Sequence, residues 1–343
     1  MRFLATADLH LKKKEDLPLL ERILDTARAH QCRAILIGGD LLDFAFPKDG
    51  LAEAIGPLLA QWGLPVYLVA GNHDPLAIAP YYGMLPPNVT VFPEAVTQYT
   101  LEPKLTLFGC SSLREESLRR PAAGLRVAPG EMGILLAHGH FDGADYQPVS
   151  AEELADSGLS MCILGHIHKG EQRQLGGCRL LVPGTPQGQG WDETGEKFVY
   201  IVDADPQRGI RTEPVSVATR FFREQTVDLT GCESTEDILA KMEQVPPADN
   251  TRYALILTGE PAIEPGAAVE LYLRRWEQNR VVDRTTPALS VEALKNQNTL
   301  QGAFVRRALA EIEQADPDRK PALEAALRLG LKAFQMSTKE GKQ

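Results

Sequence analysis

Long apolar runs are missing from this sequence. No stretch approaches the roughly 18 consecutive apolar residues that are typical of a membrane-spanning helix, which argues against an integral membrane protein. The first apolar segment is interrupted at once by Asp8 and His10, so the N-terminus does not resemble a secretory leader. From these two absences we expect a cytoplasmic protein.

Paired cysteines and an excess of basic residues are missing as well. The five cysteines lie far apart without a C-x-x-C pair, so neither a disulfide framework nor a structural zinc site is indicated. The 36 Lys and Arg against 46 Asp and Glu give a net charge of −10. This balance disfavours a simple nucleic-acid-binding module. It does not exclude one, because bound divalent cations would dominate the local field of a site.

The sequence does contain a repeated arrangement in which an apolar strand is followed by residues that can bind metals. Its centre is the stretch Arg33–Asp43, where a branched apolar run ends in two glycines and Asp40. The run predicts a strand buried on both faces, and glycine lets the chain turn sharply beside a ligand. In open α/β sheets, ligands bind at the carboxyl edge, where Asp40 would lie.

Four other segments share this arrangement. In each, an apolar run precedes one of the loops Asp8-Leu9-His10, Gly71-Asn72-His73-Asp74, His138-Gly139-His140 and Gly165-His166-Ile167-His168. Six of the 7 histidines fall in these loops, so histidine is not scattered along the chain. The remaining one, His30, lies at the end of a predicted helix and receives no functional interpretation.

The side chains of these loops form a candidate ligand set. Carboxylate, amide and imidazole donors together suit borderline divalent transition metals better than magnesium or calcium. A single histidine after a strand is more often scaffolding than a ligand, but five such loops in one chain favour the metal interpretation. The set is too large for one four-coordinate ion, so we predict two ions with open water positions. The candidates are Asp8, His10, Asp40, Asn72, His138, His166 and His168.

The order of predicted elements indicates βαβ units with parallel strands at the start of the chain. Helices are expected over residues 17–30 and 49–62, and a short helix is expected after Pro75. Later strands near residues 179–182, 198–203 and 212–217 are expected to complete a second sheet. We predict three parts: a catalytic domain over 1–220, a small α+β unit over 221–288, and a helical pair over 289–343 that follows a polar connection at 287–298.

The ordered motifs resemble those of calcineurin-like metallophosphoesterases. Within that superfamily the chain is similar to the DNA repair exonucleases of the SbcD type. It has Asp43-Phe44-Ala45 where the protein phosphatases have Arg-Gly after the aspartate, and it has Asn72-His73-Asp74 where they have Asn-His-Glu. Pro183-Gly-Thr, after the last histidine pair, is also similar to that group. The resemblance implies an α/β fold: a two-sheet α/β-β/α sandwich with a small α+β cap domain and C-terminal helices.

The resemblance also implies individual roles. Asp8, His10 and His168 would hold one metal, Asn72, His138 and His166 would hold the other, and Asp40 would bridge both. The metals would be two manganese ions, and His73 would be a catalytic residue that faces the phosphate without binding metal. His140 matches no role in the family and is assigned only a supporting one. Phe44 and Phe46 could stack on a terminal base or be buried against the cap.

As a whole, the resemblance implies a manganese-dependent DNA nuclease that works in DNA repair with an SbcC-like ATPase. The terminal helices would bind that ATPase, and the nuclease would dimerise in the complex. An alternative also stays open, in which these helices pack on each other and on the cap and bind no partner. Two other functions also stay open. One is a nucleotide phosphodiesterase or protein phosphatase with the same metals, and the other is a scaffold of the same fold without metals.

Overall fold

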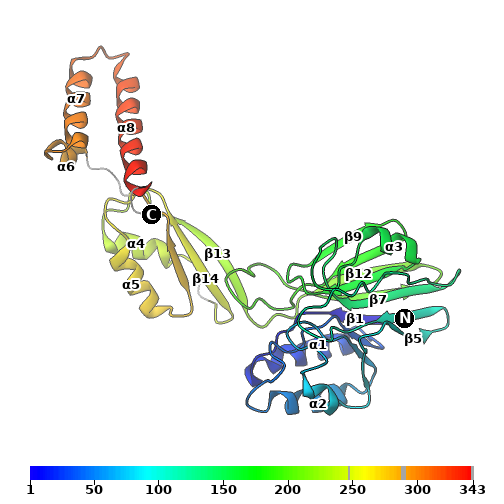
Figure 1. Cartoon of the computed structure of the whole chain (residues 1–343). Coiled ribbons are helices and arrows are strands. Elements are labelled where there is room, and N and C mark those ends of the chain that lie inside the picture. Colours follow the sequence, from blue (N-terminus) through cyan, green and yellow to red (C-terminus); the bar gives the residue numbers. More distant parts are fainter. Residues whose placement is uncertain (246–247, 287–290, 341–343) are drawn as a thin grey trace. The chain divides into compact units, whose positions relative to one another are not determined.

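The structure is a computed structural model that describes residues 1–245, 248–286 and 291–340 (Figure 1). The chain forms two compact units. The first comprises residues 1–223 with 249–251, and the second comprises 224–248 with 252–343, as far as these are described. The finer division into three domains at residues 220 and 288 stays a prediction.

The first sheet has six strands in the order β12-β11-β1-β2-β3-β4. Strands β1 to β4 are parallel neighbours, whereas β11 is antiparallel to β1 and β12 is antiparallel to β11. The parallel βαβ arrangement predicted for the start of the chain is therefore confirmed. The strands are β1 (Arg2–Thr6), β2 (Ile35–Ile37), β3 (Val66–Leu68), β4 (Val89–Val91), β11 (Val199–Asp205) and β12 (Gly209–Val215).

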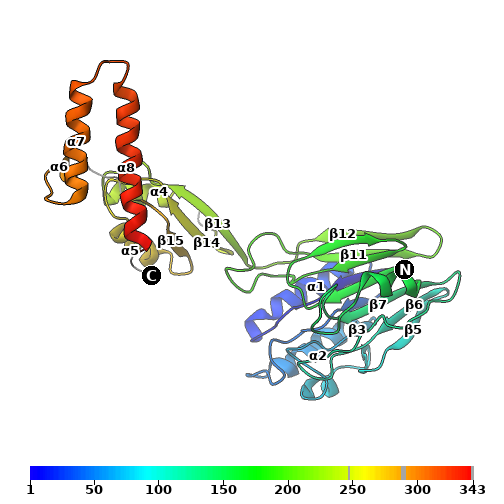
Figure 2. The ribbon, with the colours of Figure 1, turned by 45° about the horizontal axis from the view of Figure 1, so that its top comes forward.

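The second sheet also has six strands, in the order β5-β6-β7-β8-β10-β9. Its four central strands are parallel, and β5 and β9 are antiparallel edge strands. Figure 2 shows the two sheets of this unit from a second direction. The strands are β5 (Thr97–Glu102), β6 (Leu105–Gly109), β7 (Met132–His138), β8 (Met161–Gly165), β9 (Glu171–Leu175) and β10 (Cys178–Val182).

Three α-helices and two short 3-10 helices complete the first unit. Helix α2 ends at Gly63, which has a left-handed φ of 75°, and α3 begins with a capping box between Ser150 and Glu153. Helices α1 and α2 each bury apolar residues along one side. The helices are η1 (Lys14–Asp16), α1 (Leu17–Ala29), α2 (Leu51–Trp62), η2 (Pro80–Met84) and α3 (Ala151–Ser157).

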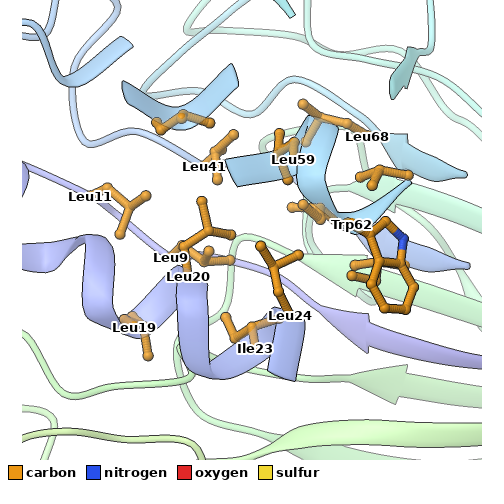
Figure 3. Packing of buried hydrophobic residues seen from close by; sticks show 14 of the residues in the cluster. Leu9, Leu11, Leu19, Leu20, Ile23, Leu24, Leu41, Leu59, Trp62 and Leu68 are labelled. Atoms are coloured by element: carbon orange, nitrogen blue, oxygen red, sulfur yellow. The ribbon is translucent and has the colours of Figure 1, made fainter. Parts of the chain in front are cut away.

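Alternating side chains of the strands build three separate apolar layers. Leu4 of β1 packs with α1 and α2 on one face of the first sheet, as seen around Leu20 and Trp62 in Figure 3. Phe3, on the opposite face of the same strand, packs between the two sheets with Leu136 of β7. The outer face of the second sheet packs against α3. Because a strand presents successive residues to opposite faces, this arrangement is the predicted two-sheet α/β sandwich, which is confirmed.

Two expectations about individual elements are wrong. Strands β11 and β12 belong to the first sheet and not to the second. The reason is that β11 is apolar on both faces, with Ile201 in the helix-side layer and Val202 in the layer between the sheets, so it needs the doubly covered position beside β1. No helix starts at Pro75: Ile78 N and Ala79 N close a single turn on Pro75 O, and the chain becomes helical only at Pro80, where the short 3-10 helix η2 begins.

The second unit contains a three-stranded sheet in the order β13-β14-β15 and two helices with their own apolar core. Its elements alternate in the predicted strand-helix order. They are β13 (Phe221–Asp228), α4 (Thr235–Met242), β14 (Thr251–Thr258), α5 (Gly266–Arg275) and β15 (Arg280–Asp283).

The last three helices form a further core of Leu294, Val305, Leu327 and Leu331. They are α6 (Val291–Lys295), α7 (Leu300–Gln314) and α8 (Lys320–Glu340). Residues 287–290 of the predicted polar connection lie outside the described residues, and the rest of it is not all loop, since α6 occupies 291–295. None of the described helices has the length and apolar character needed to cross a membrane.

Candidate metal centre

The five predicted loops meet at the carboxyl ends of β1, β2 and β3 in the first sheet and of β7 and β8 in the second. Backbone hydrogen bonds hold the first two loops side by side, since Asp8 N donates to Gly39 O at 3.0 Å and His10 N donates to Asp40 O at 3.0 Å. Across the sheets, His166 N donates to Asp8 Oδ1 at 2.9 Å. All seven candidate ligands therefore belong to one connected group of side chains.

The backbone of these loops is unusual for residues with side chains. Asp8, His10, Asp40 and His166 have positive φ angles of 53°, 46°, 48° and 88°. Such conformations are costly for non-glycine residues and are concentrated at functional sites. Gly71 is needed nearby for a different reason, because a Cβ there would lie only 1.9 Å from Asp40 Oδ1.

The first cluster joins Asp8, His10 and His168, whose ligand atoms lie within 4.8 Å of one another. The Nε2 atoms of His10 and His168 are 3.0 Å apart. Each ring is held by a carboxylate on its other nitrogen: His10 Nδ1 lies 2.9 Å from Asp43 Oδ1, and His168 Nδ1 contacts Glu193. A carboxylate on Nδ1 favours the tautomer that leaves Nε2 free as a metal ligand.

The second cluster is centred on the side-chain oxygen of Asn72. This Oδ1 atom lies 2.8 Å from His138 Nε2 and 3.0 Å from His166 Nδ1. His138 is fully buried, and its Nδ1 lies 2.8 Å from Gly38 O. Since a carbonyl can only accept, His138 Nδ1 donates and its Nε2 is left to point into the cluster.

Asp40 lies between the two clusters. Its Oδ2 atom is 3.4 Å from His138 Nε2 and 3.6 Å from His10 Nε2. Its Oδ1 atom accepts a hydrogen bond from His73 N at 2.9 Å, which fixes the carboxylate. One oxygen therefore faces both groups of imidazoles, as a bridging ligand would.

The donor set fits two divalent cations. Among the residues that the structure describes, no group donates a hydrogen bond to Asp8 Oδ2, although this oxygen is buried. A buried carboxylate oxygen without a partner is costly unless a cation neutralises it. Together with four converging imidazole nitrogens and an amide oxygen, it matches the ligand preference of transition metals.

The charges of the buried groups indicate where a cation would bind. Burial raises the pKa of Asp40, but the neighbouring His138 and His10 outweigh this effect, so its pKa lies well below the ordinary value. Burial lowers the pKa of His138, but the Asp40 carboxylate outweighs this effect and brings that pKa to about 9. Without a metal, the His138 ring is therefore protonated on both nitrogens at neutral pH. To bind a metal, it must release the proton on Nε2. Metal binding at this pair therefore competes with protons.

His166 behaves differently. Its burial, and then the nearby His138, lower its pKa to about 4. It is therefore neutral around pH 7, which is the state required of a ligand. His140 takes no part in either cluster: its ring centroid lies 6.2 Å from that of His166, and its backbone N donates to Tyr146 O at 2.9 Å.

His73 lies at the rim of the site with 42% of its side chain exposed. Its Nδ1 donates to the carbonyl of Asp43 at 3.1 Å, so Nε2 is the nitrogen left for chemistry. Its ring centroid is 4.6 Å from that of His10. His73 is also close enough to His10 and Asp40 for a cation to touch all three, and the assignment of His73 as a non-ligand is therefore a proposal.

Sequence reasoning assigned no role to three acidic residues that organise the site. Asp43 and Glu193 hold His10 and His168, and buried Asp74 accepts hydrogen bonds from Leu42 N, Gly71 N and the Tyr81 hydroxyl. Asp43 and Asp74 belong to the same motifs as the candidate ligands Asp40 and Asn72. Their short distance from these ligands in the sequence could have indicated a supporting role. Glu193 lies in an irregular Gly-rich segment and carried no local signal.

A cleft of about 740 Å³ opens beside the clusters. Asn72 and His73 belong both to the cleft wall and to the centre, so a molecule held at the metals would extend into it. Phe44 and Phe46 also line the cleft, and these two residues are 59% and 67% exposed.

A ring of imidazoles and carboxylates at a sheet edge, with a buried aspartate between two ligand clusters, is the arrangement expected of a centre that binds two metal ions. Residues 1–170 match the sequence model of the family described as Calcineurin-like phosphoesterase. The chain contains a domain of this family, which uses a dinuclear divalent metal centre, and the predicted resemblance is confirmed.

Three curated relatives resemble parts of the chain. An uncharacterized metallophosphoesterase, YhaO of Bacillus subtilis, is 27% identical over 59% of this chain and 57% of its own length. A probable exonuclease subunit 1 of Escherichia phage T5 is 23% identical over 60% of this chain and 66% of its own. The SbcD component of the nuclease SbcCD of Escherichia coli is 34% identical, but over only 22% of each chain.

Solved structures with similar folds include a dimetal phosphatase from Danio rerio, at 11% identity and a TM-score of 0.44. It matches over 63% of this chain and 96% of its own. A protein of Thermus thermophilus matches over 62% of this chain and 98% of its own, at 18% identity and a TM-score of 0.42.

Proposed function

We propose that this chain is a manganese-dependent DNA nuclease that hydrolyses phosphodiesters at the centre described above. The observation that carries the proposal is the position of Asp40 Oδ2, which lies 3.4 Å from His138 Nε2 and 3.6 Å from His10 Nε2. In the proposed assignment Asp8, His10 and His168 hold one ion, Asn72, His138 and His166 hold the other, and Asp40 bridges them. DNA as substrate is supported by the partial likeness to an exonuclease subunit and to a component of a nuclease.

Two divalent ions, when bound, would clamp the phosphodiester and acidify the water that attacks phosphorus in line with the leaving oxygen. His73 supplies the proton that the leaving oxygen needs when the P–O bond breaks. Because Nδ1–H donates to the carbonyl of Asp43, the transferred proton is the one on Nε2 of the doubly protonated imidazolium. His73 is left as the neutral ring with its proton on Nδ1. Asp43 thus positions both His10 and His73.

The direct test is incubation of the purified chain with manganese and end-labelled duplex or single-stranded DNA at low salt, beside bis-p-nitrophenyl phosphate. Low salt is required because an acidic protein should bind DNA weakly and with strong salt dependence. We expect manganese-dependent cleavage of DNA and of the small ester, and neither in a matched Asp40→Ala preparation. Turnover of phosphoproteins or cyclic nucleotides with none of DNA would favour the second candidate, a phosphatase or nucleotide phosphodiesterase of the same fold.

We also propose that helices α7 and α8 bind an SbcC-like ATPase and that the nuclease dimerises in that complex. The support is that the core of α6, α7 and α8 shares no described residue with the core of α4 and α5. In addition, Leu300 and Leu329 are 75% and 69% exposed.

Removal of residues 291–343 tests the role of the helices. The shortened chain should keep manganese-dependent hydrolysis of bis-p-nitrophenyl phosphate and lose co-purification with the ATPase. A shortened chain that becomes insoluble and inactive would show instead that the helices are needed for the fold of the nuclease.

A further inference from the structure

One wall of the cleft beside the metal centre is formed by exposed apolar side chains, which have no role in binding or hydrolysing a phosphate group. Phe44 and Phe46 are 59% and 67% exposed, and Ile78 of the same cleft is 43% exposed. All three lie within the first unit, so their arrangement does not depend on the placement of the second. Large apolar side chains of this size are normally buried, and several exposed together mark a binding surface.

Charge does not explain this surface. Lys12 and Lys48 line the cleft, but so do Asp43, Asp49 and Glu115. Lys12 Nζ is also only 3.5 Å from Asp43 Oδ2, which partly neutralises it. The cleft is therefore not a simple anion channel, and its occupant must offer an apolar face together with polar edges.

A nucleobase has these properties. Bases taken out of a helix stack against aromatic side chains and exchange hydrogen bonds with polar groups around their edges. The cleft supplies Phe44 and Phe46 for the base faces, and its lysines and carboxylates supply donors and acceptors for the edges. Asn72 and His73 connect this wall with the centre where the phosphate would lie.

We propose that the cleft binds the nucleoside next to the scissile phosphate, with Phe44 and Phe46 as the stacking surface. The proposal rests on the proposed phosphodiesterase function and narrows it to unstacked nucleotides, such as the terminal nucleotide of a strand. Phosphopeptides would lack the base that this surface requires.

Two esters with the same leaving group test the proposal. Thymidine 5′-(p-nitrophenyl phosphate) carries a nucleoside, whereas methyl p-nitrophenyl phosphate does not. With the full chain and manganese, we expect a higher kcat/KM for the nucleoside ester. Phe44→Ser with Phe46→Ser should reduce the ratio of the two values about 5- to 150-fold, the range expected for the loss of base stacking.

Two control proteins make the comparison specific. Phe44→Tyr with Phe46→Tyr keeps both rings and should keep most of the ratio. Leu64→Ser changes another exposed apolar residue, 42% exposed and outside the cleft, and should leave the ratio at the wild-type value.

Binding gives a readout that does not depend on turnover. In calorimetry, thymidine 5′-monophosphate should bind more tightly than methyl phosphate, and the double serine variant should lose this difference. Equal ratios and equal affinities in wild type and double variant would overturn the nucleoside site while leaving the phosphodiesterase function intact. Hydrolysis of neither ester, together with normal manganese content, would instead overturn the proposed function.

Discussion

The Nε2 atoms of His10 and His168 face each other at 3.0 Å, although 158 positions separate the two residues in the chain. Asp43 and Glu193 contact their Nδ1 atoms, so both Nε2 lone pairs converge on one point. Two facing lone pairs repel unless a proton or a cation lies between them. This pair is therefore the part of the centre that should depend most on its supporting carboxylates.

Glu193→Ala should weaken manganese binding by about 10- to 100-fold, the usual effect of losing a carboxylate that orients a ligating histidine. Titration calorimetry with manganese measures the change. Glu196→Ala is the matched control, because Glu196 is a nearby acidic residue that is 57% exposed and paired with Arg223. If both variants bind manganese like the wild type, Glu193 does not support a ligand.

Asp40→Ala should remove both ions together, because the Asp40 carboxylate is the group shared by the two clusters. Elemental analysis should find manganese near background, and hydrolysis should fall with it. Asp25→Ala, at a carboxylate that is 73% exposed on α1, should keep the full metal content. Retention of two equivalents of manganese in the Asp40 variant would contradict the bridging assignment.

His73→Ala should separate chemistry from metal binding. The variant should keep both ions and the fold but lose about 10²- to 10⁴-fold in turnover, as expected when a general acid is removed. Metal content and the rate of hydrolysis have to be measured on the same preparation. A parallel fall of both would mean that His73 is a ligand, as its nearness to His10 and Asp40 also permits.

The pair of Arg2 and Asp203 should make stability depend on pH at the edge of β1 and β11. The two residues face each other in the strand register, and the guanidinium donates to both carboxylate oxygens at 2.8 Å. The hydrogen bond from Arg2 lowers the pKa of Asp203 below 3.8. The stabilisation is therefore complete above the unfolded pKa and is lost as the pH falls through the lower, folded pKa.

Asp203→Asn should consequently lower the thermal midpoint above about pH 5 and have little effect near pH 2. The effect should be small, because the pair is exposed to solvent. Asp156→Asn, an exposed carboxylate of α3, is the control. A difference between wild type and Asp203→Asn that grows toward low pH would contradict the expected sign.

Local sequence patterns were sufficient to predict the loops that carry the candidate ligands and the parallel strands of the first sheet. Each strand preceding a ligand is a short apolar run, and each loop contains its polar residues within a few positions, so both signals can be found without long-range contacts. The βαβ connections then require neighbouring parallel strands, which places Asp8, Asp40 and Asn72 at one edge.

Contacts between distant segments decided which residues of the site face one another and where β11 lies. Glu193 meets His168 because both residues follow neighbouring parallel strands of the second sheet, β10 and β8. Asp40 lies between His10 and His138 because the two sheets pack face to face through their shared apolar layer. The same packing placed β11 beside β1, since a strand apolar on both faces requires cover on both. The sequence by itself determined which residues could bind metal. The tertiary structure decided which of them face one another, because those distances depend on how the sheets pack and are not encoded in any single loop.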